Sequence, residues 1–191
     1  MSPQMYSLVF PLLWLCWAAY WLIRARDVKQ VVRIESRASR YGHVLPLVVA
    51  GLLVGVAGLP VPFLERRLWP WHPWQFWAGA ALTSAGLLFA VWARLHIGRN
   101  WSGMVTVKQD HELITGGPYA LVRHPIYTGL LAAFAGSALA RGEWRGILAV
   151  VIVFFTLWRK LRLEERFMRE QFGPAYDDYS RRVRALLPWL L

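Results

Sequence analysis

The chain alternates between long apolar runs and short polar connections. The apolar runs cover residues Tyr6–Ile23, Val44–Leu64, Trp74–Leu95, Ile126–Ala140 and Trp144–Trp158. The first three are long enough to cross a hydrocarbon core of about 30 Å as helices, at about 1.5 Å per residue. Lipid offers backbone amides no partners, so each run is expected to be helical. The pattern predicts an all-α, polytopic membrane protein with five transmembrane helices.

The fourth and fifth runs are separated only by Arg141-Gly142-Glu143, so we expect a helical hairpin there. The fourth helix is predicted to begin at Pro125, because proline is tolerated at the first helical position. The fifth helix is predicted to continue to about Phe172, where Gly173-Pro174 stops it. The hairpin would therefore extend beyond the membrane into a cytoplasmic site.

The distribution of basic residues predicts the orientation. With five spans, 18 of the 22 Lys and Arg residues fall on one side, and the other side receives only Arg66, Arg67, Arg141 and Arg145. The positive-inside rule then places the N-terminus outside and the C-terminus in the cytoplasm. No basic segment precedes the first run and no cleavage pattern follows it, so we expect a retained span rather than a signal peptide.

The composition supports this membrane class. The chain is 57% hydrophobic and 17% charged, against about 25% charged residues in ordinary soluble domains. Its 191 residues suit one membrane-embedded domain, with a three-span scaffold over residues 1–99 and the polar motifs in residues 100–191. The net charge is +11, and the basic residues lie mainly in the connections between the spans. They do not form a surface of mixed basic and aromatic residues, so nucleic acid is not an expected partner.

Gly51 and Gly55, in the second run, have the spacing of a close helix–helix contact. Packing within the chain is the favoured interpretation of this pair, and a dimer face is the alternative.

The most unusual polar residues stand directly before the fourth run. The stretch Gly116–Gly129 places Tyr119, Arg123, His124 and Tyr127 at the mouth of a membrane helix, where ionisable groups are costly and usually face a cavity or a ligand. Alone, each has a plainer explanation: the arginine can reach lipid phosphates, the histidine can cap the helix, and the tyrosines can lie at the membrane interface.

A second polar cluster follows the fifth run and contains Glu164, Glu165, Tyr176 and Tyr179. Helical spacing puts Glu165 on one face with four hydrophobic residues, Trp158, Leu161, Met168 and Phe172. A carboxylate on such a face needs a partner or a ligand. The two clusters together predict one site at the cytoplasmic face.

Several chemistries are not supported by the sequence. There is no Gly-x-Gly-x-x-Gly fingerprint, no Walker phosphate loop and no nucleophile elbow. The five histidines are scattered without the spacing of a metal site, so no metal is expected. The site is expected to bind reactants that bring their own reactivity.

The motifs closely resemble those of the isoprenylcysteine carboxyl methyltransferase family, which is similar to phospholipid N-methyltransferases. The resemblance covers about residues 100–188, and the matching residues are His111-x-Leu113, Gly116-Gly117-Pro118-Tyr119, Arg123-His124-Pro125-x-Tyr127-x-Gly129, Glu164-Glu165 and Phe172-Gly173-x-x-Tyr176-x-x-Tyr179.

The resemblance implies S-adenosylmethionine as methyl donor and a lipid or prenylated small molecule as acceptor, O-methylated on an isoprenylcysteine carboxylate. It implies catalytic roles for Arg123, near the acceptor, for Arg159, with Lys160 and Arg162 as alternatives, and for Glu165. The implied donor-binding residues are His111, Leu113, Gly117, Tyr119, His124, Pro125, Tyr127, Glu164 and Glu165.

Other functions stay open at this point. The acceptor can instead be a phospholipid amine or a small thiol, because the donor motif does not distinguish these. Membrane sterol-type reductases, which use NADPH, have a similar C-terminal stretch, although the short chain and the Glu164-Glu165 pair favour a methyl donor. A non-catalytic membrane scaffold is the remaining alternative.

Overall fold

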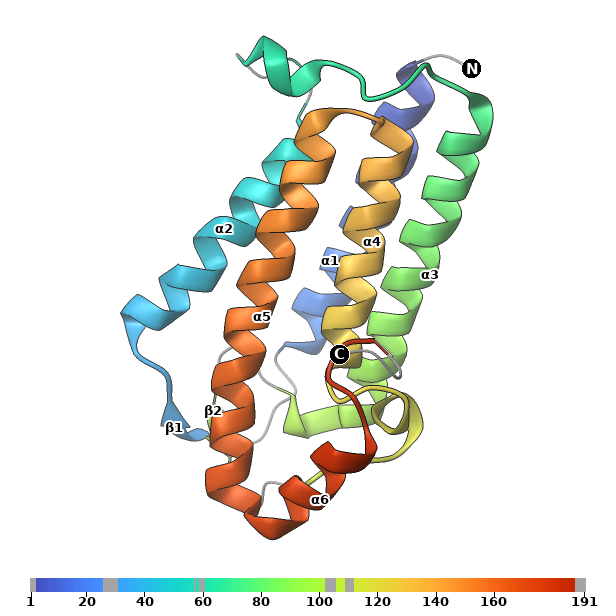
Figure 1. The fold of residues 1–191 in the computed structure, drawn as a ribbon. Coiled ribbons are helices and arrows are strands. Elements are labelled where there is room, and N and C mark those ends of the chain that lie inside the picture. The colour runs from blue at the N-terminus through green and yellow to red at the C-terminus, as the bar shows by residue number, and fades with distance from the viewer. Residues whose placement is uncertain are drawn as a thin grey trace.

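The computed structural model of the protein describes residues 3–25, 31–56, 58, 61–101, 106–108 and 112–187. Of residues 3–7, 31–34 and 106–108 it describes the backbone alone. Within these ranges the chain is a bundle of long helices with a smaller assembly of loops, short helices and a strand pair at one end (Figure 1).

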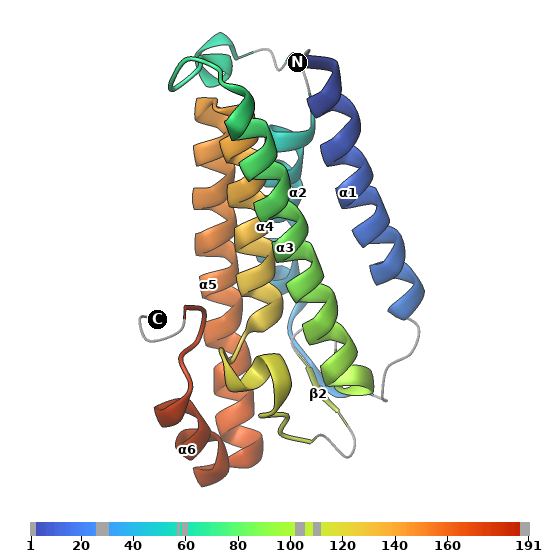
Figure 2. The same ribbon diagram turned by 90° about the vertical axis from the view of Figure 1, so that its right-hand side faces the viewer.

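The long helices are α1 (Pro3–Arg24), α2 (Arg37–Gly55), α3 (Pro73–Ile97), α4 (Pro125–Arg141) and α5 (Trp144–Phe172). Helix α4 lies between α3 and α5, and α5 also packs against α2 (Figure 1). Helix α1 stands more apart from the other helices (Figure 2). Short elements complete the chain: three 3₁₀ helices, η1 (Pro62–Glu65), η2 (Gly98–Asn100) and η3 (Gly117–Ala120), and α6 (Pro174–Arg182).

The prediction of an all-α core is confirmed, and both boundaries of the second run are wrong. That helix begins at Arg37 rather than Val44 and ends at Gly55, and residues 62–65 form η1. Ser36 explains the early start, since its hydroxyl accepts a hydrogen bond from the N–H of Ser39 as a helix cap. The fifth helix ends at Phe172, as predicted.

A short antiparallel pair, β1 (Val31–Ile34) and β2 (Thr106–Lys108), was not predicted. It joins the connection after α1 to the connection after α3. Strands this short carry little sequence signal, because they have too few residues to show an alternating pattern.

Helices α3 and α4 pack closely because small residues line their contact. A Cβ added to Gly86 would lie 2.4 Å from the carbonyl oxygen of Gly129, so neither position has room for a side chain. By contrast, a Cβ at Gly51 or Gly55 would meet nothing within 4 Å. The interpretation of that pair as a close contact within the chain is therefore wrong.

The α4–α5 turn is fastened to the end of α2. Arg141 and Arg145 are buried, and they donate hydrogen bonds to the carbonyl oxygens of Val54 and Val56 at 2.6 and 2.5 Å. The last carbonyls of a helix lie beyond its regular hydrogen-bond ladder, and here the two arginines donate to them and cap this end of α2. This turn lies at the end of the bundle opposite α6 (Figure 1).

The C-terminal segment, residues 183–187, lies against the start of α4. The backbone N–H groups of Arg123 and His124 donate to the carbonyls of Arg184 and Ala185 at 2.8 and 2.9 Å. The hydroxyl of Thr128 donates to the carbonyl of Leu186 at 2.6 Å. Residues 184–186 are thereby fixed beside the Arg-His-Pro motif.

Two helical stretches are long and apolar enough to cross a membrane, Arg37–Gly55 and Pro73–Asn100, among the residues that are described. Five membrane crossings, their orientation and the division at residue 99 stay predictions.

Candidate active site

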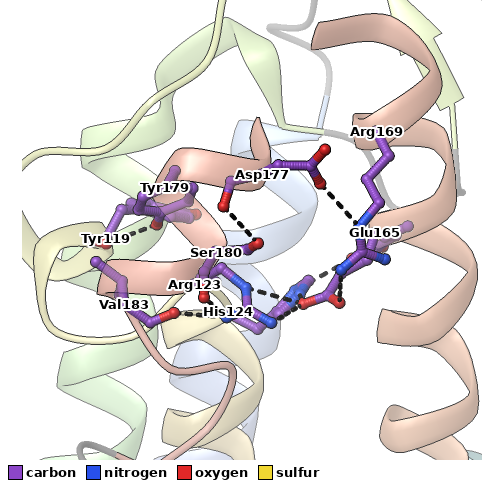
Figure 3. A network of polar contacts seen from close by, with 10 residues as sticks. Tyr119, Arg123, His124, Glu165, Arg169, Asp177, Tyr179, Ser180 and Val183 are labelled. Atoms are coloured by element: carbon purple, nitrogen blue, oxygen red, sulfur yellow. Dashed lines mark hydrogen bonds and ion pairs between the residues drawn. The ribbon is translucent and has the colours of Figure 1, made fainter. Parts of the chain in front are cut away.

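The two polar motifs meet where α4 begins and α5 turns into α6. Pro125 is the first residue of α4, so Arg123 and His124 stand immediately before it. Gly173, between α5 and α6, has a φ of 50°, which glycine adopts without steric cost. The chain therefore folds back and brings α6 beside the Arg-His pair (Figure 3).

Arg123 joins the first motif to the second and to the end of α6. Its Nε donates to Oε1 of Glu165 at 2.9 Å, and its Nη2 donates to the same oxygen. Its Nη1 donates to the carbonyls of Ser180 and Val183 at 3.1 and 2.5 Å (Figure 3). A guanidinium has five N–H donors, and these four hydrogen bonds engage most of them within the protein.

His124 lies between the two glutamates. Its Nε2 is 3.3 Å from Oε1 of Glu165, and its Nδ1 is 3.6 Å from Oε2 of Glu164. Burial alone would lower the pKa of His124, but its hydrogen bonds with Glu164 and Glu165 outweigh burial and raise that pKa. The ring stacks on Tyr127, with centroids 5.4 Å apart. His124 therefore supplies positive charge that holds both carboxylates in place.

Glu164 faces the interior of the site. It accepts a hydrogen bond of 2.5 Å from the hydroxyl of Tyr127, and the Nζ of Lys160 is 3.8 Å from the same oxygen, Oε1. Burial would raise the pKa of Glu164, but the hydrogen bond from His124 and the charge of Lys160 lower it. The carboxylate is therefore anionic at neutral pH.

Glu165 is held by cations on three sides. Besides Arg123 and His124, Arg169 lies 3.5 Å from its Oε2, and Arg169 in turn is 3.4 Å from Asp177 of α6 (Figure 3). Burial would raise the pKa of Glu165, but the hydrogen bonds from His124 and Arg123 lower it to about 2. This carboxylate is a structural anchor between α5, α6 and the start of α4.

A cavity of about 310 Å³ lies beside this network, a size at the lower end of small-molecule sites. One part of its lining is polar and comes from the two motifs; the other is aromatic and comes from α1 and the end of α3. The lining includes Trp17, Trp21, Asn100, Trp101, Leu113, Tyr119, Arg123, His124, Pro125, Tyr127, Leu157, Lys160, Glu164, Met168, Tyr176 and Tyr179.

Most of the predicted site residues line this cavity. The structure brings together Leu113, Tyr119, Arg123, His124, Pro125, Tyr127 and Glu164. Glu165 lies next to them, outside the lining. His111 lies outside the described residues. In the part of the chain that is described, no group of three His, Cys, Asp or Glu residues could hold a metal ion.

Arg159 does not lie with the others. It is exposed and donates to the backbone oxygen and the hydroxyl of Ser39, in α2, at 3.3 and 3.4 Å. Its neighbour Lys160 is buried and lines the cavity. Successive helical residues point about 100° apart, and here Lys160 faces the cavity whereas Arg159 points toward α2.

Gly117 lies against the ring of His96, which in turn contacts Tyr119 of the cavity lining. Its φ is 57°, and a Cβ there would lie 2.6 Å from the His96 ring. That ring stacks on Tyr119, with centroids 6.4 Å apart, and the Tyr119 carbonyl accepts a hydrogen bond of 2.6 Å from the Tyr179 hydroxyl. Burial raises the pKa of Tyr119 above its ordinary value, so its hydroxyl stays protonated.

The sequence did not predict the lining residues Trp17, Trp21, Trp101 and Asn100, of which three are aromatic and one is polar. Trp17 and Trp21 share a helix face, at a spacing of four. The chain has 12 tryptophans, however, and most suit a membrane interface equally well. Nothing local distinguishes the ones that reach the cavity.

Comparison with known proteins gives a consistent picture. The family model described as phospholipid methyltransferase matches residues 74–175. The nickel-cobalt-cadmium resistance protein NccN of Alcaligenes xylosoxydans xylosoxydans is 32% identical over 60% of this chain and 53% of its own length. The cobalt-zinc-cadmium resistance protein CzcN of Cupriavidus metallidurans is 32% identical over 72% of this chain and 64% of its own.

A probable protein-S-isoprenylcysteine O-methyltransferase of Oryza sativa subsp. indica is 28% identical over 61% of this chain and 64% of its own length. The chain thus spans between about half and two thirds of the length of these three relatives. The region that the family model matches contains α3, α4, α5, the first polar motif and the Glu164-Glu165 pair, whereas Tyr176 and Tyr179 of α6 lie beyond it.

Proposed function

Because the chain belongs to the phospholipid methyltransferase family, we propose that it is an integral membrane methyltransferase that takes its methyl group from S-adenosylmethionine and transfers it to a lipid-like acceptor. The resemblance to isoprenylcysteine carboxyl methyltransferases that the motifs predicted is confirmed at the level of the family. The proposed donor, the proposed acceptor and the roles of individual residues depend on the geometry of the candidate site.

The observation that carries this proposal is the partly buried Glu164 carboxylate at the edge of a largely apolar cavity. Its pKa is lowered and its position is fixed by Tyr127 and His124. An anion fixed in a mostly apolar lining is suited to a cationic ligand, because charge in such surroundings is costly unless it is paired.

The lining fits the proposed donor. Glu164 would hold its ammonium group, and tyrosine and tryptophan rings would surround its cationic sulfur and its purine. When bound, S-adenosylmethionine supplies a methyl group already activated on a sulfonium sulfur.

The work left to the protein is positioning. His124 and Tyr127 fix Glu164 from two directions, and Arg123 holds α6 and the C-terminal segment against the start of α4. Buried Leu157 and Ile126 keep water from the apolar part of the cavity. Alignment of two reactants in a dry site can supply much of the rate acceleration of such a transfer.

For the acceptor, we propose an isoprenylcysteine-like carboxylate. A carboxylate needs a cation but no general base, and Lys160 is the buried cation of the lining that can serve it. The expected role of Arg123 near the acceptor is less well supported, since its donors are engaged by Glu165 and two carbonyls. Arg159 lies away from the cavity lining.

A phospholipid amine is the second candidate acceptor, and the description of the matching family model favours it. An amine must lose a proton before or during transfer, so it would need a base within reach. Glu164, which lines the cavity beside Glu112 and is the carboxylate within the polar motifs, could take this proton.

Calorimetry in detergent tests the donor. S-adenosylhomocysteine should bind saturably and NADPH should not. Glu164→Gln should lower the affinity about tenfold or more, since a charged hydrogen-bonding partner is lost, whereas Glu170→Gln, on the exposed face of α5, should not. Saturable binding of NADPH alone would replace the methyltransferase with the reductase alternative.

Transfer of a labelled methyl group tests the acceptor. Farnesylcysteine derivatives should be labelled and phosphatidylethanolamine should not. The reverse result would move the proposal to the amine acceptor, and labelling of a small thiol alone would exclude both lipids.

A further inference from the structure

The aromatic end of the cavity contains two polar atoms without partners. Nε1 of Trp17 and Oδ1 of Asn100 are both buried and have no hydrogen-bond partner among the described residues. Asn100 is only 8% exposed, and both residues line the cavity. Buried polar groups without partners are rare in native proteins and costly, so these two atoms indicate a ligand.

The surroundings of these atoms are flat and apolar. Trp17 stacks on Trp21 with ring centroids 4.6 Å apart, and Trp21 meets Trp101 edge to face at 5.3 Å. All three indoles line the cavity. The three indoles together form an indole box, which offers the unpartnered N–H of Trp17 and the carboxamide of Asn100. Such a box suits a planar heteroaromatic ring that carries both donors and acceptors.

The box is held in place by Arg94, which is fully buried. Its guanidinium donates to the carbonyl of Arg24, at the end of α1, and to the carbonyl of Gly98, at the start of η2, at 2.7 and 2.6 Å. It also lies over the Trp101 ring, 4.5 Å from the centroid. One side chain thus fixes the two elements that supply the tryptophans and Asn100.

We infer that this aromatic end is an adenine subsite, in which the carboxamide of Asn100 recognises the 6-amino group of the purine and the Trp17 indole N–H donates to a ring nitrogen. This inference rests on the proposed function, because it names the part of the cavity that holds one end of the donor. A carboxamide forms hydrogen bonds with N6 and N7 of adenine. Aromatic side chains stack on the flat face of a base.

The position in the molecule agrees with this assignment. The polar end, with Glu164 and Lys160, comes from α5, whereas the box comes from α1 and η2. A ligand with a charged amino-acid group at one end and a purine at the other would satisfy both ends of one cavity. The polar end alone does not explain the unpartnered atoms at the aromatic end.

A purine analogue provides the test. Binding of S-adenosylhomocysteine is compared, by calorimetry in detergent, with binding of its analogue in which hydrogen replaces the 6-amino group. The full-length wild-type chain should bind the analogue about tenfold more weakly, because Oδ1 of Asn100 is again left without a partner. Asn100→Leu should bind both compounds with equal, reduced affinity.

The wild type and Asn100→Leu, each with the two compounds, form a thermodynamic cycle. Two further variants extend the comparison to the tryptophans. Trp17→Phe keeps an aromatic ring but removes the N–H, and it should weaken S-adenosylhomocysteine severalfold. Trp92→Phe alters an exposed tryptophan of α3 outside the cavity lining and should change nothing. If Asn100→Leu does not fold, Asn100→Ala carries the same comparison.

The outcomes separate the two proposals. If S-adenosylhomocysteine does not bind the wild type at all, the proposed function fails. If it binds but the 6-amino group makes no difference, or if Asn100→Leu keeps the wild-type preference, the adenine subsite is wrong while the methyltransferase stands. Variants that alter only the KM of the acceptor would likewise overturn the subsite.

Discussion

Glu164 and Glu165 are neighbours in the sequence, but they contact different nitrogens of His124 and lie in different surroundings. Glu164 lines the cavity and bonds to Tyr127. Glu165 lies behind it and bonds to Arg123. Adjacent residues of a helix point in different directions, so two chemically identical side chains can take separate roles, and we propose binding for Glu164 and architecture for Glu165.

This division predicts that the two glutamines behave differently. Glu165→Gln should lower stability by about 3 kcal/mol, because it leaves Arg123 as a buried charge with its anion removed. Glu164→Gln should mainly weaken donor binding. Thermal unfolding and calorimetry in detergent measure both. Equal effects of the two variants on melting temperature would show that the division is wrong.

The same network predicts a pH dependence of stability. The pKa of Glu165 is lowered from 4.5 to about 2, so its contribution is complete above pH 4.5 and is lost as the pH falls toward 2. The pKa of His124 is raised above 6.5, so its contribution is complete below pH 6.5 and is lost as the pH rises through the raised value.

The melting temperature in detergent should therefore be highest between these limits and fall on both sides. Glu165→Gln should reduce the acid decline, and His124→Asn should reduce the alkaline one. A wild-type profile without either decline would contradict this account of the network.

At the scale of elements, the contact of α3 with α4 depends on glycine. A Cβ at Gly129 would lie 2.4 Å from the carbonyl oxygen of Gly86, and both atoms belong to rigid helices. Gly129→Ala should therefore cost about 1–3 kcal/mol through overpacking. Gly51→Ala, where nothing lies within 4 Å, is the matched control. Equal melting temperatures of the two variants would contradict the close contact.

The attachment of α6 gives a second prediction at this scale. The hydroxyl of Tyr179 donates to the carbonyl of Tyr119 at 2.6 Å, within the buried interior. Tyr179→Phe should cost about 1 kcal/mol, and it should speed hydrogen exchange at the amides of Arg123 and His124, which pair with the C-terminal segment. Tyr41→Phe, at an exposed position, should leave that exchange unchanged.

At the scale of the whole molecule, the two ends of the bundle differ in character. One end carries α6, the polar network and the cavity; the other carries the α4–α5 turn and η1 (Figure 1). Two of the four basic residues counted at the second end, Arg141 and Arg145, are buried as caps of α2. At the first end Arg94 and Lys160 are buried as well, so the predicted asymmetry rests on the count of 18 basic residues against 4.

This asymmetry predicts the orientation in the membrane. On a Cys16→Ser background, Arg66→Cys should react with an impermeant thiol reagent from outside intact cells. Arg181→Cys should react only after permeabilisation, since the positive-inside rule places its end in the cytoplasm. Both positions are exposed in the structure. Labelling of both from the same side would contradict five spans.

The sequence by itself determined the long helices, the start of α4, the end of α5 and the neighbourhood of the site. Pro125 and Gly173 mark boundaries through local backbone geometry, which needs no tertiary context. The polar motifs were recognisable because ionisable residues beside apolar runs are unusual. The family resemblance and the polar part of the cavity lining followed from these local signals.

Only the tertiary structure decided what each side chain contacts. It assigned Arg123 to carbonyls of the chain end, chose Lys160 over Arg159 for the cavity, and brought Trp17 and Asn100 to one site from segments far apart in sequence. Helical periodicity defines a face, but the neighbour of that face depends on how all helices pack. Contacts between distant segments therefore leave no signal in either segment alone.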